Sequence, residues 1–106
     1  PLPGKIDAET AAKLLEAYKK VYDPADEQSE WFEKIKGICP EFGFAPDMKT
    51  YKASPDDFGG NPGEVSTVIR LAVTGRVNTP DLCGIMRVLG DKSIERIEDA
   101  IKHYKG

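Results

Sequence analysis

Apolar residues recur every three to four positions over five stretches of the chain, and this spacing places them on one face of an α-helix. The stretch that follows Asp7, which can cap a helix, contains no glycine or proline as far as Tyr22. The stretch that carries the single tryptophan runs up to Pro40, which should end or kink that helix because proline lacks an amide donor. The pattern predicts helices over residues 8–22, 24–39, 64–74, 80–89 and 92–104.

Prolines and glycines mark the predicted helix boundaries. Asp23 and Thr79 each precede a proline, and an N-cap residue followed by proline at the first helical position is a typical helix start. Gly75 and Gly90 stand where the third and fourth helices should end, because glycine readily adopts the left-handed conformation that follows a helix.

No stretch alternates apolar and polar residues in the manner of a β-strand. Residues 45–63 contain three prolines and three glycines, so they are predicted to form a connection with short helical turns near residues 46–51 and 55–58. A connection of this length is usually functional or mobile. The chain of 106 residues therefore predicts a single all-α domain over residues 1–106, a compact bundle of about five helices.

Charge narrows the function. The chain has 15 Lys and Arg residues against 18 Asp and Glu residues, and its formal net charge of −3 excludes a general nucleic-acid coat protein, which would be basic. The arginines all lie after residue 60. Since arginine is the residue suited to planar contacts with phosphates and bases, an anion or nucleic-acid site is expected in that second part of the chain.

The sequence lacks the motifs of several classes of protein. Cys39 and Cys83 form no CxxC motif, which favours reduced, core-packed thiols in a cytoplasmic protein. The sequence has no run of about 18 apolar residues, the length that a membrane span requires. It also has no HExxH, no paired Cys/His ligand set and no Gly-x-Ser-x-Gly. We therefore expect no membrane association, no catalytic residue and no metal site in this chain.

Residues suited to ligand binding gather around the predicted turn between the third and fourth helices. Arg70 lies on the outer side of the third helix, Arg76 follows its terminal glycine, and Leu82 comes near the start of the fourth helix. Asn78 and Thr79 lead into a helix N-terminus, whose unpaired N–H groups favour phosphate or base acceptors. An arginine plane beside an exposed apolar side chain is what an unstacked RNA base requires. The alternative is an ordinary corner between two helices with scattered surface arginines.

The stretch from Val65 to Ile101 closely resembles the C-terminal anticodon-binding domain of bacterial-type glutamyl-tRNA synthetases. The resemblance rests on an arginine, a small apolar pair, Thr-Gly, a short variable link, Thr-Pro, an apolar helix and Leu-Gly. In this sequence these are Arg70, Ala72-Val73, Thr74-Gly75, Thr79-Pro80, Leu82 to Val88 and Leu89-Gly90. A weaker similarity, which includes Trp31-Phe32, covers most of the remaining chain.

The resemblance implies an all-α cage of helices that holds the anticodon loop of a tRNA. It implies that Arg70 contacts or stacks on an anticodon base and that Thr79 and Pro80 meet the middle base. It also implies that Leu82 packs against the first anticodon base.

Two further residues complete the expected RNA-binding set. Arg76 is not fixed in the family pattern and is assigned a phosphate contact only. Cys83 stands where the family often has a bulky aromatic residue, a departure that shifts stacking toward Leu82. The expected RNA-binding residues are Arg70, Arg76, Asn78, Thr79, Pro80, Leu82 and Cys83.

By the same resemblance, the chain is expected to be a piece of a longer synthetase that attaches glutamate to tRNA with ATP and Mg²⁺. The family's ATP-binding segments, His-Ile-Gly-His and Lys-Met-Ser-Lys-Ser, do not occur in this sequence. The chain alone is therefore expected to be inactive and to hold no cofactor. Its expected partners are the anticodon loop of tRNA(Glu), with tRNA(Gln) as a second candidate, and the remaining synthetase domains. We expect a monomer.

Two other functions stay open. A helical protein-interaction module would use a groove of exposed aromatic residues at Phe44, Tyr51 and Phe58, and its binding would depend neither on salt nor on Arg70. A free-standing regulatory copy of the synthetase domain is the other alternative. The abrupt Pro-Leu-Pro-Gly start favours a piece of a longer chain over that second alternative.

Overall fold

The computed structural model describes residues 2–79 and 81–106, and over these residues all regular secondary structure is helical. The α-helices are α1 (Ala8–Val21), α2 (Gln28–Ile38), α3 (Met48–Ala53), α4 (Pro62–Thr74), α5 (Leu82–Leu89) and α6 (Asp91–Lys105), and the 3₁₀ turns are η1 (Cys39–Phe42) and η2 (Pro55–Asp57). The all-α prediction is confirmed. The helix beyond the predicted five is α3, which replaces one of the short turns expected in residues 45–63.

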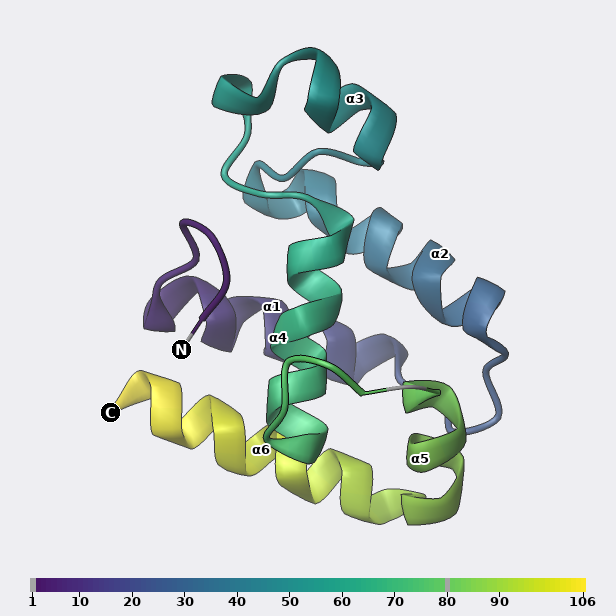
Figure 1. The fold of residues 1–106 in the computed structure, drawn as a ribbon. Helices are drawn as coiled ribbons and strands as arrows, with labels where there is room; N and C mark the ends of the chain where they lie inside the picture. Colours follow the sequence, from purple (N-terminus) through teal and green to yellow (C-terminus); the bar gives the residue numbers. More distant parts are fainter. Residues whose placement is uncertain (1, 80) are drawn as a thin grey trace.

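Helix α4 runs through the middle of the molecule and packs against α1, α2 and α6 (Figure 1). Helix α6 also packs along α1, and α5 contacts α6. Helix α3 and turn η2 stand away from the other helices at one end of the molecule (Figure 1). None of the helices in the described part of the chain is long and apolar enough to cross a membrane.

The core is built from the apolar stripes that the sequence predicts. Leu15 and Tyr18 of α1, Ile35 of α2, Val68 of α4 and Ile97 of α6 are all fully inaccessible to solvent. Burial of one such aliphatic side chain favours folding by roughly 1.5–3 kcal/mol. The four longest helices thus share one core, and α4 presents only part of its surface to solvent.

The predicted start of the second helix at Asp23 is wrong. The Asp23 carboxylate instead accepts a hydrogen bond from the amide of Ala25 (2.9 Å), which closes a turn. Helix α2 begins only at Gln28, where Glu27 and Glu30 form a reciprocal capping box. A local turn therefore competes successfully with helix initiation at the proline.

The predicted start of the fourth helix is also wrong. Helix α5 begins at Leu82, and its cap is Asp81, whose carboxylate accepts a hydrogen bond from the amide of Gly84 (3.1 Å). Thr79 is not the cap, and its predicted helical neighbour Pro80 lies outside the described residues. Gly75 does end α4 as predicted, with a left-handed φ of 75°.

Residues 45–60 leave the core and return to it through a narrow neck. The amide of Gly59 donates to the carbonyl of Gly43 (3.0 Å), and the amide of Ala45 donates to the carbonyl of Gly60 (3.0 Å). The ring of Phe44 lies against Gly60 so closely that a Cβ there would come within 2.6 Å of it. The glycines after η2 thus close the neck over a buried ring.

That packing corrects the aromatic groove expected of a protein-interaction module. Phe44 is 4% exposed and belongs to the core, and Tyr51 and Phe58 are half-buried. The first of the three expected exposed rings is therefore not available at the surface.

Candidate functional site

A groove of about 490 Å³ lies between the Gly63–Arg70 part of α4 and the link that joins α4 to α5. We call it the α4 groove. It is lined by Gly63, Ser66, Thr67, Arg70, Val77, Asn78 and Thr79. Three residues predicted from the sequence, Arg70, Asn78 and Thr79, therefore line one surface feature.

Two neighbouring residues hold the guanidinium of Arg70 in place. It lies over the ring of Trp31, 5.5 Å from the ring centroid, and its Nη1 donates to Ser66 Oγ (2.8 Å). The Ser66 hydroxyl donates its own hydrogen to the carbonyl of Gly63 (2.7 Å), so its oxygen is oriented to accept from the guanidinium. A guanidinium carries five N–H donors, so a fixed plane with further donors is presented to a ligand in the groove.

The link after α4 is tied to the end of that helix by the hydroxyl of Thr74. This hydroxyl donates to the carbonyl of Arg70 (2.8 Å) and accepts from the amide of Arg76 (3.1 Å). It also lies 3.0 Å from the hydroxyl of Thr79, which lines the groove. One side chain at the last turn of α4 thus sets the course of residues 75–79.

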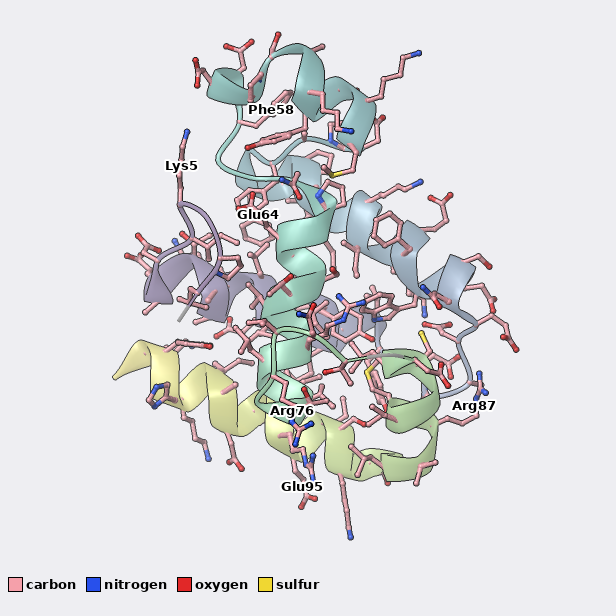
Figure 2. All side chains as sticks on the ribbon, viewed as in Figure 1. Lys5, Phe58, Glu64, Arg76, Arg87 and Glu95 are labelled. Atoms are coloured by element: carbon pink, nitrogen blue, oxygen red, sulfur yellow. The ribbon has the colours of Figure 1, made fainter. Side chains whose placement is uncertain are left out.

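Arg76 lies outside the α4 groove. Its side chain is exposed and extends from the link toward α6 (Figure 2). On the α6 side, Arg96 donates to the carbonyl of Val73 (2.8 Å), which satisfies a carbonyl in the last turn of α4. The structure thus places Arg76 where it could meet a phosphate, but not a base held in the groove.

The expected exposure of Leu82 is wrong. Leu82 is 3% exposed and Cys83 is 6% exposed, and both belong to the hydrophobic core together with Met86. Both side chains lie on the face of α5 that packs against the core. Burial raises the pKa of the Cys83 thiol, and the nearby Asp81 carboxylate adds to this effect.

Sequence reasoning missed the two residues that fix Arg70. Ser66 precedes Arg70 by four positions on the same helix, so helical spacing could have identified it. Trp31 comes from α2, and its place under the guanidinium results from the packing of α2 against α4. No local pattern could have indicated that contact.

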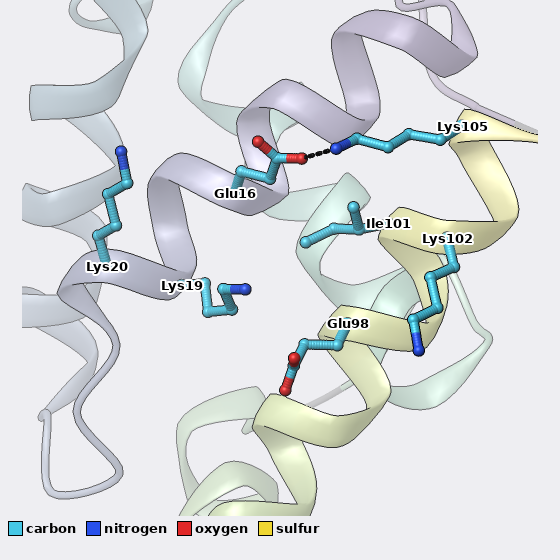
Figure 3. A pocket seen from close by; sticks show the side chains of 7 residues that line it. All are labelled: Glu16, Lys19, Lys20, Glu98, Ile101, Lys102 and Lys105. Carbon is cyan, nitrogen blue, oxygen red and sulfur yellow. Dashed lines mark ion pairs between the residues drawn. The ribbon is translucent and has the colours of Figure 1, made fainter.

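A second hollow, of about 270 Å³, lies between α1 and α6, and we call it the α1–α6 hollow (Figure 3). It is lined by Glu16, Lys19, Lys20, Glu98, Ile101, Lys102 and Lys105. Lys105 pairs with Glu16, and this hydrogen-bonded contact lowers the pKa of the Glu16 carboxyl. No residue predicted for the site lies in this hollow.

Comparison with known proteins gives a consistent set of matches. A family model described as an anticodon binding domain matches residues 5–101. The chain is 47% identical over 97 residues to a glutamate–tRNA ligase of Acetivibrio thermocellus, and 38% identical over 97 residues to one of Clostridium perfringens. It is 44% identical over 92 residues to a glutamate–tRNA ligase of Sorangium cellulosum.

These matches cover most of this chain but little of the relatives. They include 91%, 91% and 87% of the chain, against 18%, 18% and 16% of the three relatives in the same order. The chain therefore spans less than a fifth of the length of these relatives. No solved structure gives a significant match.

Proposed function

The chain belongs to the anticodon binding domain family, and we propose that its α4 groove recognises the anticodon loop of a glutamate tRNA. The observation that carries this proposal is the convergence of Arg70, Asn78 and Thr79 on one groove, with Arg70 already fixed by Trp31 and Ser66. Unstacked bases in RNA loops are recognised by planar groups that stack and by polar groups that read the base edge. The α4 groove offers both.

Each residue of the site has a distinct part in this proposal. The guanidinium of Arg70 donates hydrogen bonds to a base, and the amide of Asn78 offers a donor and an acceptor. Thr79 meets the same base, and Pro80 is assigned to it by the family resemblance. Exposed Arg76 contacts a phosphate. A base contact of this kind contributes roughly 1–3 kcal/mol.

Leu82 and Cys83 are proposed to support the site without contacting the RNA. Because both are buried in the core, we propose that they fix the first turn of α5, and with it the end of the link that lines the groove. A direct contact of Leu82 with a base would require this side chain to leave the core. The burial of Leu82 therefore supports a structural role for this residue.

The whole protein is proposed to be a glutamate–tRNA ligase, as the names of the relatives suggest. We propose that it acts in the cytoplasm. ATP and Mg²⁺ would then be used by domains that this chain does not include. Among residues 2–79 and 81–106, no group of three or more His, Cys, Asp or Glu side chains is arranged to hold a metal ion. We propose that the chain acts as a monomer, and that tRNA(Gln) is a second partner to test.

The direct test is an NMR titration of the 106-residue chain with a stem-loop that carries a glutamate anticodon. The control RNA has the same stem and a scrambled loop. Only the glutamate loop should shift the signals of Arg70, Asn78 and Thr79, and Arg70→Ala should remove these shifts. Equal shifts with both loops, spread over surface lysines, would show charge binding without anticodon recognition. If neither loop causes shifts at high concentration, the proposal is wrong.

A further inference from the structure

Helix α5 is tied toward its C-terminal end to the turn between α1 and α2, residues 22–27, which we call the α1–α2 turn. Tyr22 precedes its partner Gly90 by 68 positions, and Asp26 precedes its partner Arg87 by 61. Resting on the function proposed above, we propose that the α1–α2 turn sets the position of α5 for RNA binding. Tyr22 and Arg87 are then positioning residues, since neither lines the α4 groove.

The hydroxyl of Tyr22 holds the corner between α5 and α6. Its oxygen lies 2.9 Å from the carbonyl oxygen of Gly90 and 3.4 Å from that of Met86, and its single hydrogen is donated to the nearer one. The ring of Tyr22 packs edge-on against that of Tyr18, with 6.1 Å between the centroids. Because Tyr18 is fully inaccessible to solvent, the core fixes this ring and with it the direction of the Tyr22 hydroxyl.

The guanidinium of Arg87 makes the second connection. Figure 2 shows Arg87 extending from α5 toward the α1–α2 turn, where its Nη2 donates to the carbonyl of Asp26 (3.3 Å). The same nitrogen lies 3.8 Å from the carboxylate of Glu27. Both side chains of that ion pair are more than half exposed, so the pair contributes little. The hydrogen bond to the backbone of Asp26 is therefore the contact that gives the connection its direction.

The α1–α2 turn can anchor α5 because an ion pair holds the turn itself. Lys34 of α2 donates to the carboxylate of Asp26 (2.6 Å) and to the carbonyl of Val21 at the end of α1 (2.8 Å). The side chain of Asp26 is 8% exposed, so salt and water screen this pair only weakly. One ammonium group thus joins α1, the turn and α2, and the residue that it holds is the one that accepts from Arg87.

The remaining contacts of α5 define its direction less sharply. The helix has eight residues, and those buried in the core are Leu82, Cys83 and Met86. Apolar packing depends on buried area rather than on direction, so it opposes a small tilt of the helix less than oriented hydrogen bonds do. Leu82 follows the groove residue Thr79 by three positions. A tilt of α5 therefore moves the end of the link, and the α1–α2 turn opposes that tilt.

The experiment removes both connections in the double variant Tyr22→Phe with Arg87→Gln. Phenylalanine keeps the ring against Tyr18, and glutamine removes the guanidinium. The matched control is Tyr104→Phe with Lys102→Gln, which removes one hydroxyl and one positive charge from α6. NMR titrations measure the affinity of each protein for the glutamate and scrambled stem-loops at several salt concentrations.

The double variant should bind the glutamate loop about tenfold more weakly, the size expected when two ordinary hydrogen bonds are lost, and it should bind the scrambled loop as its control does. The control should keep the ratio of the two affinities within about twofold of wild type. If the double variant keeps the wild-type ratio, the inference is overturned while the proposed function stands. If wild type does not distinguish the two loops, the proposed function itself fails.

Two further readouts separate positioning from a direct contact and from general destabilisation. The slope of affinity against salt should be no shallower in the double variant than in the control, because Arg87 touches no phosphate. In the absence of RNA, amide hydrogen exchange should accelerate about tenfold in α5 and keep its wild-type rates in α1 and α4. A shallower slope than that of the control, or faster exchange throughout the chain, would overturn the inference.

A second measurement needs no variant, in case the double variant does not fold. If RNA binding requires the position of α5 that the α1–α2 turn sets, then bound RNA stabilises that position in return. In the wild-type chain, the glutamate stem-loop should slow hydrogen exchange of the α5 amides about tenfold, and the scrambled loop should not. Equal exchange rates of α5 in the free chain and in the complex with the glutamate loop would overturn the inference.

Discussion

The α4 groove and the α1–α6 hollow both present cationic side chains, but they hold them differently. In the groove, Arg70 is half-buried, lies over Trp31 and donates to Ser66. In the hollow, Lys102 is exposed, and Lys105 remains 60% exposed although it pairs with Glu16. Long exposed side chains lose up to about 2 kcal/mol of conformational entropy when a ligand orders them.

Because of this difference, the groove is suited to recognise a particular base, whereas the hollow can only attract phosphates. A fixed guanidinium can test the donor and acceptor pattern of a base, because its N–H groups have set directions. Mobile lysines can only add attraction for phosphates, and this attraction does not depend on sequence. The acidic residues Glu16 and Glu98 lower even that attraction in the hollow. The net charge of −3 is thus compatible with RNA recognition at one groove.

The largest effect is expected from the core residue beneath the groove. Leu82→Ala removes a side chain that is 3% exposed, and it should lower the free energy of unfolding by about 2–5 kcal/mol. Val88→Ala, on the same helix at 87% exposure, is the matched control and should change it by no more than about 0.5 kcal/mol. Urea denaturation of both variants measures this. Similar small effects for the two variants would show that Leu82 does not support the site.

A smaller effect, on RNA affinity, is expected when the guanidinium of Arg70 is replaced by an ammonium group that keeps the positive charge. Arg70→Lys should weaken binding of the glutamate stem-loop by about tenfold, because an ammonium is a point charge without a planar face. The control is the double variant Lys102→Ala with Lys105→Ala, which removes two charges from the hollow. It should weaken the glutamate and scrambled loops by the same modest factor. The two sites would be equivalent if Arg70→Lys also affected both loops equally.

The smallest effect concerns the ion pair in the hollow. Because Lys105 hydrogen-bonds Glu16, the pKa of Glu16 should lie below its ordinary value of 4.5. Protonation in the folded chain then lags behind that in the unfolded chain. The pair therefore favours folding above the ordinary pKa, and this contribution is lost as the pH falls through the lowered pKa.

Carboxyl NMR shifts recorded against pH measure this pKa, and Lys105→Ala should return it toward the ordinary value. A Glu16 carboxyl that titrates at the same pH in both proteins would contradict the ion pair in solution.

The helices could be predicted because the apolar stripes repeat over many residues and bury their faces in one core. Two helix starts could not, because single side chains decide them. Asp23 closes a turn with Ala25, and Asp81 caps α5 in place of Thr79. In both cases a short-range hydrogen bond displaced the start expected from a proline.

The site was partly predictable for a similar reason. Arg70, Asn78 and Thr79 have chemistry that the sequence displays, and the structure brings them to one groove. The apolar spacing of Leu82, Ile85, Met86 and Leu89 already places Leu82 on the buried face of α5, and only its place beside the turn suggested an exposed side chain. The contact of Arg70 with Trp31 joins two helices, so it appears only once they are packed.

The most direct measurement is the affinity of the wild-type chain for the glutamate and scrambled stem-loops over a range of salt concentrations. Both RNAs carry the same phosphates, so both affinities should fall with salt along the same slope. Base recognition in the α4 groove does not release counterions, so the glutamate loop should keep an advantage of about tenfold at every salt concentration. A ratio of one throughout the range would contradict anticodon recognition by this chain.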